Sequence, residues 1–109
     1  MTYLNTSNTD MIIKIRYKDK GKMQEAEVNA YKAFNLFGFR FYVHRVDIDP
    51  VDGNLWRVTE LTTGFRICPD DFNTMREAVT ASRLYLVIKG EENVNEVISK
   101  ALEFIKKNQ

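Results

Sequence analysis

Apolar and polar residues alternate with a period of two along the first part of the chain. At residues 11–18, Ile13, Ile15 and Tyr17 fall on one side, and the residues between them are Lys and Arg. The same alternation recurs at residues 23–31 and 39–47. Because successive side chains of a strand point to opposite faces, this pattern predicts three half-buried β-strands.

Residues 54–67 predict a hairpin that contains the only tryptophan, Trp56. Its two strands would meet at Thr62-Thr63-Gly64, where the glycine supplies the positive φ that a tight turn needs. Asp19-Lys20-Gly21 predicts another turn, and residues 49–54 predict a loop because Pro50 cannot donate to a strand ladder. The sequence therefore predicts up to five strands in succession.

After Cys68 the period becomes helical. Thr74-x-x-Glu77 and Asn93-x-x-Glu96 both have the form of a helix-capping box. Residues 84–88 fit either one face of the first helix or a sixth, buried strand, and both alternatives stay open. The second helix has one apolar face, made of Val94, Val97, Ile98, Ala101, Leu102 and Ile105.

Short connections without alternating strand and helix units predict an α+β fold. The expected architecture is an antiparallel four- to five-stranded meander sheet with two C-terminal helices packed on one face. Residues 1–10 are expected to form a flexible N-terminal lead-in and residues 11–109 a single domain. The helices would cover the face that carries Ile13, Ile15, Val28, Phe39, Phe41, Trp56, Val58 and Ile67.

The overall composition is that of an ordinary globular protein. Of the 109 residues, 44% are hydrophobic and 28% charged, and the net charge is +1. This charge gives no general argument for a nucleic-acid or membrane partner. With neither a signal-peptide pattern nor an apolar run of about 20 residues, we expect a cytoplasmic protein without a membrane partner.

The sequence predicts neither catalysis nor a cofactor. It has one histidine and one cysteine, so a Cys68–His44 nucleophile pair would depend on a specific contact that the spacing does not indicate. Asp47, Asp49 and Asp52 lack the spacing of a calcium loop. We therefore expect a non-enzymatic protein without a metal site.

One set of polar residues stands out as a candidate binding site. If every strand alternates regularly, cations and aromatic rings share the sheet face opposite the helices. Such a face suits single-stranded nucleic acid, because cations bind phosphates and rings stack on bases. If Glu25 and Glu27 neutralise the cations, protein contacts are favoured instead. The candidate residues are Lys14, Arg16, Arg40, Tyr42, His44, Arg57 and Arg66.

Several stretches resemble small uncharacterised proteins of phages and other mobile elements. The resemblance covers about residues 30–80 and rests on the Trp-x-Val-Thr strand at Trp56, the Thr-Gly turn at Gly64 and the Thr-x-x-Glu-Ala helix start at Thr74. Ala30–Phe34 and Phe39–His44 also belong to it. It implies no activity and no catalytic residues, but an accessory role such as binding and blocking a host protein.

The sequence thus predicts a small non-catalytic protein-binding module, with single-stranded nucleic-acid binding as the alternative. Any homodimer is expected to form through the last strand, at residues 65–67, or through the sheet face. Pairing between the first strands of two copies is disfavoured because it would bring Lys14, Arg16 and Lys18 of one copy close to the same cations of the other.

Overall fold

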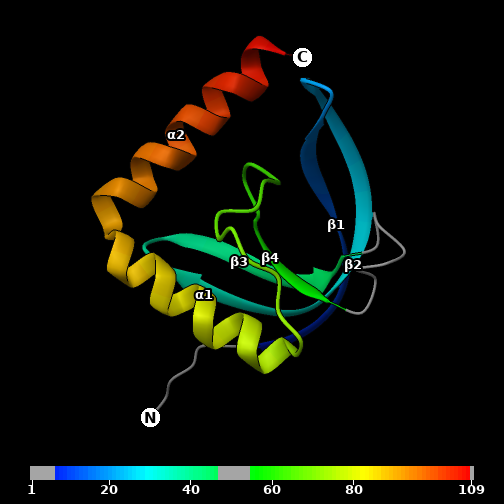
Figure 1. The fold of residues 1–109 in the computed structure, drawn as a ribbon, viewed down its shortest axis with the longest axis vertical. Coiled ribbons are helices and arrows are strands. Elements are labelled where there is room, and N and C mark those ends of the chain that lie inside the picture. Colours follow the sequence, from blue (N-terminus) through cyan, green and yellow to red (C-terminus); the bar gives the residue numbers. More distant parts are fainter. Residues whose placement is uncertain (1–6, 47–54, 109) are drawn as a thin grey trace.

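The fold is a meander sheet followed by two helices, described for residues 7–46 and 55–108 in a computed structural model (Figure 1). Each strand pairs antiparallel with the next, in the order β1-β2-β3-β4. This confirms the predicted α+β class, the meander and the two C-terminal helices. The elements are β1 (Ser7–Asp19), β2 (Lys22–Leu36), β3 (Phe39–Arg45), β4 (Trp56–Glu60), α1 (Met75–Lys89) and α2 (Glu91–Lys107).

Two strand boundaries differ from the prediction. β1 begins at Ser7, so residues 7–10 belong to the sheet, and residues 1–6 of the predicted lead-in lie outside the described residues. Residues 65–67 do not form the fifth strand but contribute a single bridge between Thr59 and Arg66. The chain turns sharply after Glu60 and returns beside β4, where a second bridge joins Trp56 and Phe72. The predicted loop at residues 49–54 also lies outside the described residues.

An irregularity at Tyr31 gives the sheet two separate cores. Ala30 pairs with His44 and Lys32 pairs with Val43, so Tyr31 is an extra residue in β2. Such a bulge exchanges the faces on which side chains before and after it lie. The predicted helix-covered face is therefore wrong for three residues, because the opposite face carries Ile13, Ile15 and Val28.

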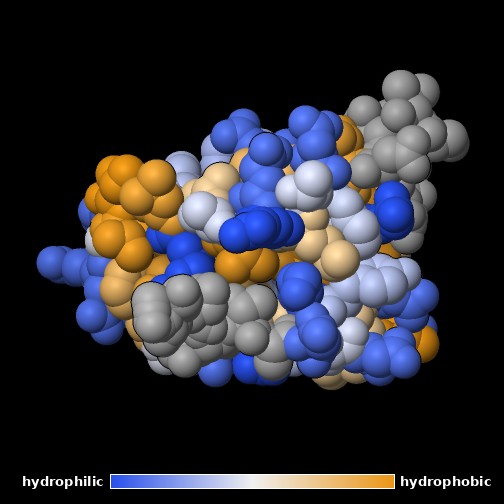
Figure 2. All heavy atoms as spheres, turned by 90° about the horizontal axis from the view of Figure 1, so that it is seen from below, coloured by the Kyte–Doolittle hydropathy of each residue, from blue (hydrophilic) through white to orange (hydrophobic). Residues whose placement is uncertain are grey.

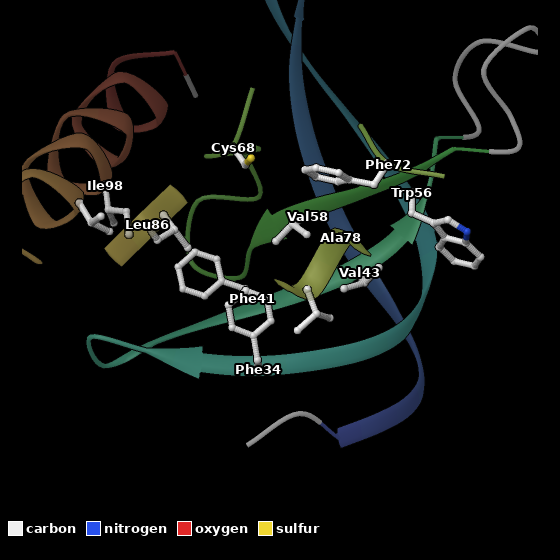
Figure 3. Close-up of a cluster of buried hydrophobic side chains, with 12 residues drawn as sticks. Phe34, Phe41, Val43, Trp56, Val58, Cys68, Phe72, Ala78, Leu86 and Ile98 are labelled. Atoms are coloured by element: carbon white, nitrogen blue, oxygen red, sulfur yellow. The ribbon is translucent and has the colours of Figure 1, made fainter. Parts of the chain in front are cut away.

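The first core lies between α1 and the sheet (Figure 3). The rings of Phe34 and Phe41 stack with centroids 5.1 Å apart. Leu86 of α1 and Ile98 of α2 close the cluster from the helical side. Residues 84–88 are thus helical, which resolves the alternative left by the sequence.

A side-chain cap fixes the start of α1 but not that of α2. Thr74 accepts a hydrogen bond from the Glu77 N–H at 3.0 Å, and the Glu77 carboxylate accepts one from the Asn73 N–H at 3.2 Å. The second predicted box does not start a helix, because α2 already begins at Glu91. The Asn93 amide instead donates to the Lys89 carbonyl at 2.8 Å.

The second core lies inside a curl of the sheet. The hairpin of β1 and β2 rises away from α1 beside the segment that follows β4 (Figure 1). The Arg16 N–H donates to the Gly64 carbonyl at 2.7 Å, so the outer edge of β1 reaches the turn after β4. The curl encloses Ile13, Ile15, Val28, Ala30, Ala33 and Tyr42.

Candidate functional site

The predicted binding face does not exist as one surface. Tyr42 and His44 are buried, with 3% and 1% of their surface exposed, and they face the inside of the curl. His44 Nε2 lies 2.7 Å from Thr59 Oγ1. The prediction of an outward position was wrong for both because the Tyr31 bulge places them on the same face as the apolar residues of β1.

Other predicted site residues are held by local partners. Lys14 and Arg16 extend from the opposite face of β1, where Glu25 lies 3.7 Å from Lys14 Nζ and 3.0 Å from Arg16 Nε. Glu27 is the register partner of Lys14. The Arg40 guanidinium donates to the Tyr42 hydroxyl at 3.0 Å. The cations at these positions therefore have local partners, and the buried Tyr42 ring is not available for stacking on bases.

Three of the predicted residues do meet at one cleft. It lies between the C-terminal half of β1, the start of β4 and the segment at residues 64–66, and its volume is about 520 Å³. We call it the cationic cleft. Its charged lining consists of Arg16, Lys18, Arg57 and Arg66, and its described lining residues include no Asp or Glu.

The same cleft has apolar walls. Ile15, Val46 and Phe65 line it beside the cations, and Tyr17 adds an aromatic ring with a hydroxyl. The Phe65 ring also touches Phe104 of α2, with centroids 6.2 Å apart. A ligand in this cleft would therefore meet positive charge and apolar surface together.

Asp71 holds two of the arginines in place. Its carboxylate accepts hydrogen bonds from Arg57 Nε at 2.8 Å and Arg57 Nη2 at 2.9 Å, and from Arg66 Nη2 at 2.9 Å. Such a bidentate pair fixes the plane of the guanidinium. One carboxylate thus binds two guanidinium groups, and Asp70 adds a second negative charge near Arg66.

The environment shifts the pKa of both Asp71 and Arg66. Burial by itself would raise the pKa of Asp71, but hydrogen bonding and charge from Arg57, followed by the charge of Arg66, outweigh it and lower the pKa. Burial lowers the pKa of Arg66, and the nearby charge of Arg57 lowers it further. The carboxylate is thus ionised at neutral pH.

The turn after β4 forms one wall of the cleft. The carboxylate of the fully buried Glu60 accepts hydrogen bonds from the Thr62 N–H at 2.7 Å and the Thr63 N–H at 2.9 Å. Gly64 N–H then donates to the Glu60 carbonyl at 2.9 Å. This turn aims the carbonyls of Thr63 and Gly64 at Arg16, which donates to Thr63 through Nη1 at 2.9 Å.

Sequence reasoning missed Asp71 and the role of Glu60. Asp71 lies in the irregular segment between β4 and α1, so no period relates it to the arginines that it contacts, and its acidic type was the only available signal. Glu60 lies at a strand end, where its carboxylate accepts hydrogen bonds from the Thr62 and Thr63 N–H groups.

A second surface was also missed. On the outer side of α1, Leu84, Val87 and Ile88 are 59%, 54% and 76% exposed. They stand at helical positions i, i+3 and i+4 and so form one strip, which we call the α1 strip. Viewed from below, apolar side chains gather at the end of the molecule where α1 meets α2 (Figure 2).

Comparison with protein-family models, curated proteins and solved structures finds no match. Within the described parts of the chain, neither helix combines the length and apolar character needed to cross a membrane.

Proposed function

We propose that this chain is a small non-catalytic protein-binding module whose cationic cleft receives an acidic segment of a partner protein. The observation that carries the proposal is the convergence of Arg16, Lys18, Arg57 and Arg66 on one cleft with an apolar wall. Such a site offers charge and buried area to the same ligand, and arginine is enriched in the energetic centres of protein interfaces.

Carboxylates are the favoured ligands because the arginines already have the geometry to bind them. Arg57 and Arg66 both donate to Asp71, and Arg16 donates to Glu25. A planar guanidinium matches a carboxylate in two parallel hydrogen bonds. Apolar residues between the acids of a partner segment would lie against Ile15 and Phe65.

Single-stranded nucleic acid is the second candidate, and one observation favours it. Tyr17 and Phe65 line the cleft together with the cations, so ring faces for bases and charges for phosphates are close together. Protein binding ranks first because the net charge is only +1 and Tyr42, the ring expected to stack, is buried.

An accessory, inhibitor-like role in the cytoplasm completes the proposal. The resemblance of residues 30–80 to small proteins of phages and mobile elements supports binding that blocks a host protein. The only cysteine, Cys68, is a buried free thiol, which suits a reducing compartment.

The first prediction concerns the cations of the cleft. A short labelled peptide in which Glu alternates with Leu should bind at low salt, with an affinity that falls as salt rises. Lys18→Gln and Arg66→Gln should each weaken binding about three- to tenfold, since each removes a charge from the lining. Fluorescence anisotropy measures the affinity.

Lys14→Gln is the matched control, because it removes the same charge from the same strand outside the cleft lining. It should bind the peptide as the unmodified protein does. The peptide with Gln in place of Glu should not bind. Equal losses for Lys14→Gln and Lys18→Gln would contradict a defined cleft, and tighter binding of an oligothymidine than of the peptide would favour the second candidate.

A further inference from the structure

The cationic cleft runs along the open edge of β1. Consecutive residues of this strand, 15–18, all line it. Successive side chains of a strand point to opposite faces, so a cleft that all of these residues line lies beside the strand and not over one of its faces. Because β2 occupies the other edge of β1, the cleft follows the edge that the sheet leaves open.

The main-chain groups of Lys18 point toward this open edge. The turn at residues 20–21 has positive φ at both positions, +53° and +79°, and joins β1 to β2 as a two-residue hairpin. The residues that flank such a turn exchange main-chain hydrogen bonds, and along each strand bonded positions alternate with outward-pointing ones. Arg16 fits this alternation, because its N–H donates outside the hairpin, to the Gly64 carbonyl. Lys18 is the next outward position.

Beyond the contact with Gly64, the edge of β1 has no main-chain partner. The segment that follows Gly64 turns to β4, where Arg66 bridges to Thr59. Within the described residues, no hydrogen bond reaches the Arg16 carbonyl or the N–H and carbonyl of Lys18. Unpaired groups of this kind are a template for pairing with another strand.

We propose that the acidic partner segment binds in the cleft as an added strand, antiparallel to β1 and hydrogen-bonded to Lys18. This inference rests on the proposed function and specifies the form in which its ligand binds. The added strand lies along the edge from the point where the contact with Gly64 ends, and it has the antiparallel direction of the three strand pairs of the described sheet. In such complexes main-chain bonds supply affinity and alternate side chains supply specificity.

Charge selects an acidic strand for this edge. Lys18 is the cation of the cleft lining that forms no ion pair in the part of the chain that the structure describes, and its Nζ lies 4.4 Å from the centre of the Phe104 ring. In antiparallel pairing the residue directly opposite Lys18 lies on the same face, so an acid there is next to the ammonium group. The alternate residues of the segment point to the other face, where Ile15 and Tyr17 line the cleft and apolar side chains fit.

Methylation of the peptide nitrogens tests the added strand with the alternating Glu-Leu peptide. If Glu lies opposite Lys18, the Glu N–H groups point toward β1 and the Leu N–H groups point away from it. N-methylation of the Glu residues should therefore weaken binding at least about tenfold, whereas N-methylation of the same number of Leu residues should weaken it less than about threefold. The Leu-methylated peptide is the matched control, since it has the same composition and charge. Fluorescence anisotropy measures both affinities.

Hydrogen exchange detects the same contact on the protein. Saturating peptide should slow exchange of the Lys18 amide at least about tenfold. The Ile12 amide is the control, because it also points outward from β1 but lies on the other side of the Gly64 contact, outside the cleft lining, and its exchange should not change.

The outcomes separate this inference from the proposed function. If the unmodified peptide does not bind, both are wrong. If it binds with an affinity that falls as salt rises, but N-methylation has equal effects at the two sets of positions or acts only at Leu, the proposed function stands and the antiparallel added strand is overturned. Unchanged exchange of the Lys18 amide at saturating peptide would overturn it as well.

Discussion

At the scale of single residues, Asp71 fixes the positions of two arginines that line the cleft. Two guanidiniums share its carboxylate, and Arg66 also donates to the Cys68 carbonyl at 3.2 Å. The side chains of Arg57 and Asp71 are each 17% exposed, so water has little access to this ion pair. Breaking such a pair costs more than its formation contributes, because the remaining charge stays partly buried.

Asp71→Asn should therefore lower the free energy of unfolding at neutral pH by about 1–3 kcal/mol. The folded-state pKa of Asp71 lies below its ordinary value, so its stabilisation is fully present above the unfolded-state pKa and is lost as pH falls through the folded-state pKa. The difference in the free energy of unfolding between the unmodified protein and Asp71→Asn should shrink over this acidic range. Urea denaturation at a series of pH values measures it, and a constant difference would contradict the role of this charge.

The candidate site was predictable only where the strand period holds. Arg57 lies on the same sheet face as His44, as the regular period of β4 predicted. Arg16 lies on the other face of β1 and reaches the cleft only because the edge of β1 meets the turn after β4. Tyr42 and His44 were misplaced by one extra residue at Tyr31, and an inserted residue leaves no mark in composition or charge. The period of two thus predicts which residues share a face only up to the next bulge.

At the scale of elements, α2 shows what a helical pattern can and cannot predict. The period of residues 94–105 predicted the helix, and the structure has it at Glu91–Lys107. The period did not predict how much of the apolar face of α2 is covered by the rest of the protein. Ile98 is buried in the first core, whereas Leu102 is 43% exposed. A helix that touches the rest of the protein along a narrow line leaves the margin of its apolar face in water.

This difference gives a matched pair of truncations on one helix. Ile98→Ala should cost about 2–5 kcal/mol, because it leaves a cavity beside Leu86. Leu102→Ala should cost less than about 1 kcal/mol, since a half-exposed side chain loses little buried area. Chemical denaturation compares the two, and equal costs would mean that α2 docks differently.

At the scale of the whole molecule, the four strands could be predicted and the closure of the curl could not. The order of the elements follows from local periods and turns. The closure depends on a contact between β1 and a turn more than 40 residues later, where the Arg16 N–H meets the Gly64 carbonyl. No pattern in the sequence relates these positions. The fold class was therefore correct, while the separation into two cores was not foreseen.

Gly64 is the residue on which this closure depends. Its φ is +73°, and a Cβ there would lie 3.1 Å from the Lys14 carbonyl oxygen and 3.2 Å from the Arg16 nitrogen. Both are backbone atoms, so no side-chain rotation can make room. Gly64→Ala must therefore shift β1 and the turn slightly apart, and it should cost about 2–4 kcal/mol from the strained φ and the displaced backbone together.

Gly21→Ala separates these two causes, because Gly21 also has a positive φ, +79°, but nothing lies within 4 Å of its added Cβ. It should cost only about 1–2 kcal/mol for the strained backbone. In Gly64→Ala, hydrogen exchange of the Arg16 amide should also accelerate, and the acidic peptide should bind less tightly although every cation of the cleft is present. If both glycine variants lose the same stability and Arg16 stays protected, the contact between β1 and the turn does not hold the curl closed.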